Sequence, residues 1–153
     1  MKLSGQRTLP ASVEFTWTAL NDPEVLKACI KGCESLESTA PDEYMAALKV
    51  KIGPVNARFK GKLNLEDVQA PSSYTIRFEG QGGIAGFGKG QAHVNLEPQN
   101  DNTQTLLTYE SEAQVGGKIA QIGSRLVDSA ATKIANEFFT AFEEHITKAQ
   151  TAN

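Results

Sequence analysis

The two cysteines of this 153-residue chain, Cys29 and Cys33, are four positions apart, which raises the question of a metal site. A structural zinc site needs about four ligands, usually in two close pairs. There is no second cysteine pair, and the only histidines, His93 and His145, are distant in sequence. We therefore predict no metal site, with Cys29 packed in a helix and Cys33 at the start of a strand.

The histidines are the residues best suited to acid–base chemistry, but neither has a nucleophile or an orienting acid nearby in sequence. His93 falls on the polar phase of an alternating segment, and His145 lies beside Glu144 late in a helical pattern, so both are expected to be exposed. General acid–base catalysis needs positioned partners. We predict no catalytic residue, no bound cofactor and no enzymatic activity.

A glycine-rich segment, residues 80–90, holds six glycines in eleven positions. A phosphate-binding loop would be followed by a helix and would end in a lysine and a hydroxyl residue. Here a strand pattern follows, so that interpretation fails. Glycines in strands mark bends, bulges or close backbone approach. A hairpin or a bend is favoured over the alternative, a mobile gate with Phe87 at its apolar tip.

A basic stripe is predicted on the outer face of two adjacent strands, formed by Lys49, Lys51, Arg58, Lys60 and Lys62. Such stripes are usually solvated faces. The functional alternative is a docking surface for an acidic partner or for anionic lipid headgroups. The net charge of −3 argues against nucleic acid as a partner.

The composition, with 40% hydrophobic and 22% charged residues, is that of an ordinary globular protein, and the length fits a single domain over 1–153. No apolar run reaches the ~18 residues that a membrane-spanning helix needs. The first residues lack the apolar core of a signal peptide. A cytoplasmic location is expected, with at most peripheral contact with the inner membrane face.

The longest regular pattern runs from Lys118 to about Lys148 and predicts one continuous helix, roughly 45 Å long. Apolar residues recur every three or four positions along it, at Ile119, Ile122, Leu126, Ala130, Ile134, Phe138, Phe142 and Ile146. Polar residues separate them. A helix with such a stripe needs a large apolar surface to lie on.

The preceding residues supply that surface. Leu3 to Leu9 reads as a strand, and start signals at Ser12 and at Asp22-Pro23 predict two short helices. The pattern then changes to alternation, which predicts about six further strands in hairpin succession. They are expected near residues 34–38, 44–52, 55–65, 74–78, 90–96 and 105–113. The fold class is therefore α+β, with a curved antiparallel sheet of about seven strands wrapped around the long helix.

A sheet curled around a helix leaves space for an apolar ligand, and alternation and helical phase together predict its lining. The strand positions are Leu48, Val50, Phe59, Leu63, Ile76, Phe78, Leu107 and Tyr109, with Phe87 from the glycine-rich segment. The helix positions are Ile122, Leu126, Ala130 and Ile134. The alternative is that these side chains fill a closed core.

Four stretches together resemble the carbon monoxide dehydrogenase CoxG family, which is part of the START-like (SRPBCC) helix-grip superfamily. They are Asn21 to Glu34, Lys51 to Leu63, Gly82 to Gly90, and Glu112 to Asp128 running into Asn136-Glu-Phe-Phe139. Lys31 departs from the family pattern, which usually has proline before the glycine. The resemblance covers nearly the whole chain and implies a helix-grip fold.

The resemblance also implies a function. Family members accompany aerobic molybdenum-containing carbon monoxide dehydrogenases and related hydroxylases, and help maturation, membrane recruitment or electron transfer through a bound quinone. The expected partners are thus subunits of such a hydroxylase and an apolar molecule, a quinone or a lipid. The alternative is a small START-like enzyme of cyclase or hydrolase type. That would need a polar group in the pocket, for which Arg7, Tyr109 and Ser111 are the candidates.

Overall fold

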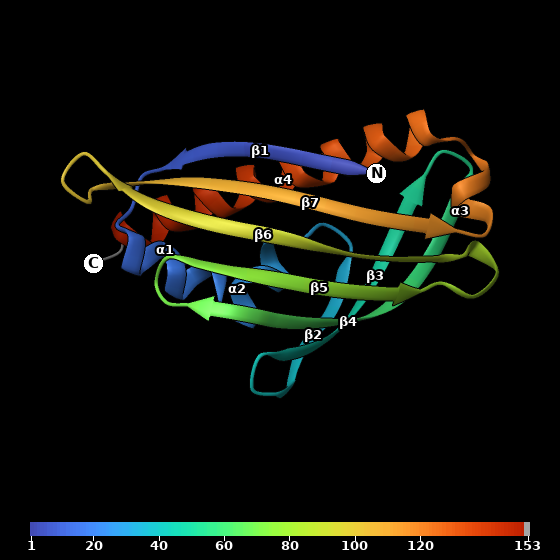
Figure 1. Ribbon diagram of the computed structural model, residues 1–153, viewed down its shortest axis with the longest axis horizontal. Helices are drawn as coiled ribbons and strands as arrows, with labels where there is room; N and C mark the ends of the chain where they lie inside the picture. Colours follow the sequence, from blue (N-terminus) through green and yellow to red (C-terminus); the bar gives the residue numbers. More distant parts are fainter. Residues whose placement is uncertain (152–153) are drawn as a thin grey trace.

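The computed structural model describes residues 1–151, which form one sheet, two short helices and a long C-terminal helix (Figure 1). The strands are β1 (Lys2–Leu9), β2 (Cys33–Ala40), β3 (Glu43–Ile52), β4 (Val55–Gln69), β5 (Ser73–Gln81), β6 (Phe87–Gln99) and β7 (Gln104–Gly116). The helices are α1 (Val13–Leu20), α2 (Pro23–Cys29), the short 3-10 turn η1 (Gly83–Ala85), α3 (Lys118–Gln121) and α4 (Ser124–Thr151).

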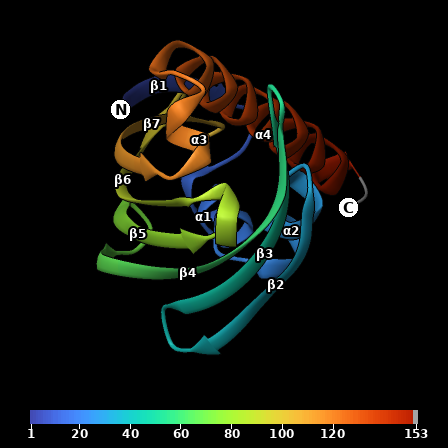
Figure 2. The same cartoon turned by 90° about the vertical axis from the view of Figure 1, so that its right-hand side faces the viewer.

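The seven strands form one antiparallel sheet in the order β1-β7-β6-β5-β4-β3-β2. The sheet curves around the interior, and α4 lies across its open side (Figure 2). Along β4, half-buried and exposed residues alternate from Val55 onward, as the period-two pattern predicts. The predicted helix-grip architecture is confirmed.

The two short helices begin where the capping signals place them. The Ser12 hydroxyl accepts a hydrogen bond from the backbone N–H of Phe15 at 3.1 Å, which caps α1. The Asp22 carboxylate caps α2 by accepting from the N–H of Glu24 at 3.0 Å. Cys29 is buried at the end of α2 and Cys33 begins β2, so both cysteines lie where the packing interpretation predicts.

The prediction of one continuous helix from Lys118 is wrong. The stretch is divided into a single turn, α3, and the long helix α4, which starts at Ser124. Gly123 lies between them with φ +102°, a left-handed conformation that glycine adopts without a steric penalty. The chain changes direction there, so Ile119 is buried while Ile122 leaves the helical stripe and occupies the link.

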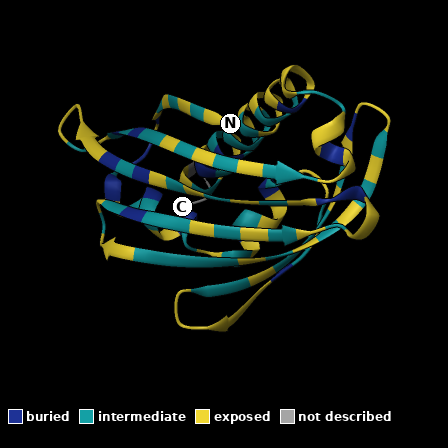
Figure 3. Ribbon diagram, turned by 45° about the vertical axis from the view of Figure 1, so that its right-hand side comes forward, coloured by how far each residue is buried: buried dark blue, intermediate teal, exposed yellow. Residues whose placement is uncertain are grey.

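The packed core occupies one end of the molecule. It gathers α1, α2, the C-terminal part of α4 and the adjoining strand ends, with Leu9, Leu96, Leu107, Phe142 and Ile146 almost inaccessible. Two buried hydroxyls are satisfied there, since Thr105 donates to the Ala11 carbonyl at 2.8 Å and lies 3.4 Å from the Thr16 hydroxyl. Elsewhere the sheet is largely half-buried or exposed (Figure 3).

Candidate ligand-binding cavity

An apolar cavity of about 340 Å³ lies at the other end of the interior, between the concave face of the sheet, α3 and the segment that follows α2. Small-molecule sites usually measure ~300–1,000 Å³, so the volume suits a ligand of modest size. The lining residues are Ile30, Cys33, Leu36, Ala46, Leu48, Val50, Phe59, Gly61, Lys62, Leu63, Phe78, Glu79, Gly80, Phe87, Gly88, Val115 and Ile119.

A row of glycines forms the floor of this cavity. Gly61 of β4 pairs with Gly80 of β5, and Gly80 pairs with Gly88 of β6. Ala46 and Val115 continue the row on either side. Because paired residues of neighbouring strands point to the same face, the row removes three adjacent side chains from the interior. The cavity exists where those side chains are missing.

Neither Gly80 nor Gly88 is required by the backbone. Neither has a positive φ, and a Cβ built on either would make only ordinary contacts, at 3.8 Å or more. Glycine inside a strand is unfavourable by roughly 0.5–1 kcal/mol relative to alanine. Gly61 is more restricted, since its Cβ would lie 3.1 Å from the Glu79 carbonyl oxygen. The absence of side chains at 80 and 88 therefore leaves interior space rather than relieving strain.

Six of the thirteen residues proposed from the sequence line the cavity. They are Leu48, Val50, Phe59, Leu63, Phe78 and Phe87. All six come from strands β3 to β6. Their role in binding stays a prediction.

The other seven lie elsewhere. Leu107 belongs to the core, and Ile76 and Tyr109 pack against it; the Tyr109 ring stacks on Phe139 with centroids 5.2 Å apart. None of the four helix positions, Ile122, Leu126, Ala130 and Ile134, lines the cavity. Leu126 and Ile134 are each 46% exposed. The break at Gly123 explains this difference, because Ile119 of α3 and the segment after α2 provide the wall expected from α4.

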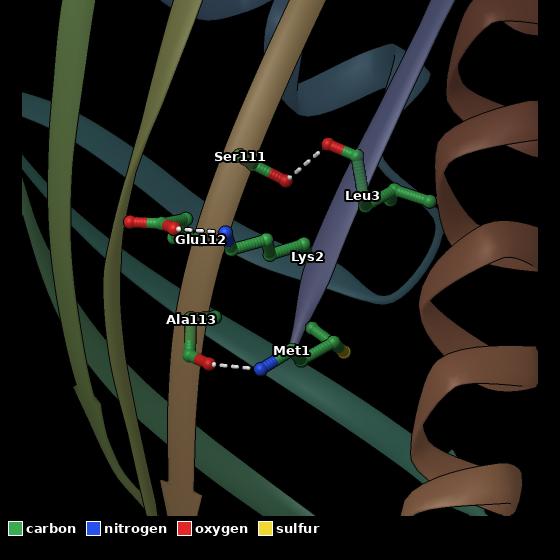
Figure 4. Close-up of polar contacts among 6 residues, drawn as sticks. All are labelled: Met1, Lys2, Leu3, Ser111, Glu112 and Ala113. Carbon is green, nitrogen blue, oxygen red and sulfur yellow. Dashed lines mark hydrogen bonds and ion pairs between the residues drawn. The ribbon is translucent and has the colours of Figure 1, made fainter.

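The polar candidates for an enzyme site are also engaged outside the cavity. The Ser111 hydroxyl donates to the Leu3 carbonyl at 3.1 Å, across the β1–β7 pairing (Figure 4). The Arg7 guanidinium donates to the Thr140 hydroxyl on α4 at 3.5 Å. Tyr109 stacks on Phe139. None of the three lines the cavity.

The polar residues that do touch the cavity are poorly suited to catalysis. Lys62 and Glu79 are cross-strand neighbours, both exposed, and alternate with the inward residues of β4 and β5. Cys33 is the one thiol in the lining. Burial raises the pKa of the Cys33 thiol above its ordinary value, so it is mainly the weakly nucleophilic thiol at neutral pH.

A wider hollow of about 670 Å³ lies on the outer face of the sheet. Charged residues dominate its lining, and several are paired with one another. Lys2 lies 3.3 Å from Glu112, and the amino group of Met1 donates to the Ala113 carbonyl at 3.0 Å (Figure 4). Its charges are thus largely compensated within the sheet.

Other features weighed from the sequence have clear positions. Residues 1–151 contain no cluster of three or more metal-ligating side chains. His93 is exposed and its Nδ1 lies 3.1 Å from the Thr75 hydroxyl, whereas His145 is half-buried rather than exposed. The glycine-rich segment is the β5–β6 hairpin. Ile84, not Phe87, stands at its tip, and Phe87 begins β6.

The sequence model for CoxG, a carbon monoxide dehydrogenase subunit, matches residues 5–147. The chain belongs to the CoxG family. The resemblance inferred from the sequence is thereby confirmed over nearly its whole length. A comparison with curated protein sequences gave no significant match.

Solved structures agree with this assignment. A conserved protein from Geobacillus kaustophilus is 35% identical, with a TM-score of 0.91 and 97% of each chain covered. A START superfamily protein from Mycobacterium smegmatis shares 15% identity (TM-score 0.75, 97% of this chain and 98% of that one). The Zhui aromatase/cyclase from Streptomyces sp. R1128 shares 11% (TM-score 0.68, 97% and 94%). These last two likenesses establish the START-like fold of this CoxG-family chain.

Proposed function

We propose that this CoxG-family protein is a non-enzymatic carrier that holds an apolar molecule, such as an isoprenoid quinone or a fatty acyl chain, in the cavity. The observation that carries the proposal is the glycine row. Gly80 and Gly88 have ordinary backbone conformations and room for a side chain, yet hold none. An apolar wall around such a space favours a ligand with few polar groups.

The partner follows from the family. We propose that the protein serves an aerobic molybdenum-containing carbon monoxide dehydrogenase or a related hydroxylase, in maturation, membrane recruitment or electron transfer. The family description, which names a subunit of carbon monoxide dehydrogenase, supports this assignment. A carrier of quinone would link such an enzyme to an electron acceptor.

Carriage is favoured over catalysis because of the cavity wall. The similarly folded Zhui protein is by its description an aromatase/cyclase, so the fold itself is compatible with either activity. An enzyme of that kind would need a polar group turned into the cavity. Arg7, Tyr109 and Ser111 are engaged outside it.

The test is to fill the cavity with Gly80→Val. A valine there should keep or slightly raise the free energy of unfolding, because it replaces a strand glycine and enters empty space. Binding of a short-chain isoprenoid quinone, or of a fluorescent fatty acid, should weaken at least ~10-fold because the side chain occupies ligand volume. Urea denaturation and equilibrium titration measure the two effects.

The matched control is Gln81→Val, the exposed neighbour of Gly80 on the same strand. It should leave binding unchanged. Loss of ~1–3 kcal/mol of stability in Gly80→Val would instead indicate an overpacked, closed interior. A stable Gly80→Val protein that binds as wild type, or a wild type that binds neither probe, would refute the carrier function.

A further inference from the structure

Three chain connections meet at the end of the molecule opposite α1 (Figures 1 and 2). They are the β3–β4 turn, the β5–β6 hairpin and the β7–α4 link that contains α3. A Cβ built on Gly117 would lie 2.5 Å from Gly86 Cα, so the second and third connections touch. A methyl of Leu126 lies 3.7 Å from the corresponding position on Gly53, which brings the first alongside.

Apolar side chains are exposed at this end. Ile84, at the hairpin tip between glycines, is 85% exposed. Leu126, at the start of α4, is 46% exposed, and Phe87 is 39% exposed although it also lines the cavity. Phe87 therefore connects the exposed apolar residues with the rim of the cavity.

The same end is strongly basic. The chain has 18 acidic residues, but none lies in 44–65, 80–96 or 113–127, which hold eight of its 15 lysines and arginines. Of these eight, Arg58 pairs with Glu34 and Lys62 with Glu43, both at 3.0 Å. The remaining six have no carboxylate within ion-pair distance in the described part of the chain. The excess charge is thus left for an external partner.

We propose that this end docks on an anionic phospholipid bilayer, with Ile84 inserted among the acyl chains. The docking surface consists of the apolar residues Ile84, Phe87 and Leu126 and the cations Lys51, Lys118 and Arg125. Each cation near an anionic membrane strengthens binding about fivefold, and a buried apolar side chain adds the hydrophobic term.

A bilayer fits this surface better than an acidic protein does. The apolar residues stand on a narrow tip and a helix start rather than on a flat patch, and a fluid bilayer admits a tip without a complementary pocket. No helix within residues 1–151 is long and apolar enough to span a membrane, so the contact is interfacial. Docking would also turn the rim of the cavity toward the lipid phase. The inference rests on charge and exposure and does not depend on what the cavity holds.

Flotation with vesicles tests the electrostatic part. Wild type should bind vesicles of phosphatidylcholine with about 30% phosphatidylserine, should not bind phosphatidylcholine alone, and should be released at about 0.5 M salt. Lys118→Glu/Arg125→Glu should weaken binding at least ~25-fold. Lys27→Glu/Lys133→Glu makes the same change of net charge away from this end and should weaken it less than ~3-fold.

Fluorescence tests the insertion. In a Trp17→Phe background, Ile84→Trp emission should shift to the blue on addition of the same anionic vesicles, whereas Val68→Trp, at an exposed position of β4 far from the hairpin, should not shift. Circular dichroism checks that each variant is folded. Wild type that does not float with anionic vesicles, equal weakening by the two double variants, or an unshifted Ile84→Trp emission would overturn the proposal.

Discussion

At the scale of single residues, Asn102 joins two parts of the molecule that are distant in sequence. Its side-chain oxygen accepts from the N–H of Val13 at 3.0 Å, and its side-chain nitrogen donates to the Glu14 carboxylate at 2.8 Å. The β6–β7 loop is thereby attached to the first turn of α1. Both contacts lie at the packed end of the interior.

This contact predicts an acid-sensitive contribution to stability. The hydrogen bond from Asn102 is the main reason that the pKa of Glu14 lies below its ordinary value. A carboxyl whose folded pKa is lowered stabilises the protein above its unfolded pKa and loses that contribution as the pH falls through the folded pKa. Between about pH 5 and about pH 3, wild type should therefore lose more stability than Glu14→Gln.

Urea midpoints across that range measure the difference. Glu97→Gln, at an exposed position of β6, is the control and should follow wild type. Parallel curves for wild type and Glu14→Gln would show that the contact with Asn102 does not favour the ionised carboxylate.

At the scale of elements, α4 has two parts with different surroundings. Phe142 and Ile146, in its C-terminal part, are inaccessible and lie in the core. Leu126 and Ile134, in its N-terminal part, are half-exposed although they continue the same apolar series. The helix therefore contributes most of its burial at one end.

The two parts should respond differently to truncation. Phe142→Ala should cost about 3–5 kcal/mol, since the ring is fully buried and leaves a cavity. Ile134→Ala should cost less than about 1 kcal/mol, because an exposed side chain loses little burial and alanine favours the helix. Urea denaturation gives both values; comparable losses would mean that the helix is packed evenly along its length.

The elements also show how far sequence reasoning reaches. Period-two alternation and capping residues are local signals, and they predicted the seven strands and the starts of α1 and α2. The break before α4 was missed because a glycine within an apolar helical stripe is compatible with both a helix and a turn. At Gly123 the surrounding structure decides for the turn.

The cavity lining was predicted only in part for a related reason. Alternation identifies which strand residues face inward, and it found six lining residues, among them Phe59 and Phe78. It does not give the strand register, so it could not show that Gly61, Gly80 and Gly88 lie side by side. Aligning the hairpins by their turns is the one signal that could have brought these glycines together.

At the scale of the whole molecule, charge and packing are both divided between two ends. The end near α1 holds the core, and most of the acidic residues fall outside the basic segments. The opposite end holds the cavity, the glycine-rich hairpin and the unpaired cations. The two ends share one continuous sheet, so they are parts of a single domain.

The separation of core and cavity has a consequence for hydrogen exchange. Backbone amides near Leu96 and Leu107 should exchange only through global unfolding, with rates that depend strongly on denaturant. Amides of the β5–β6 hairpin and of the link around α3 have few packed side chains above them and should exchange through local opening, with little denaturant dependence. Mass spectrometry of deuterium uptake at several urea concentrations distinguishes these classes, and uniform dependence along the chain would contradict it. The free energy needed to open the hairpin beside the cavity is then a property of that end alone, so its contents can exchange many times during the lifetime of one folded molecule.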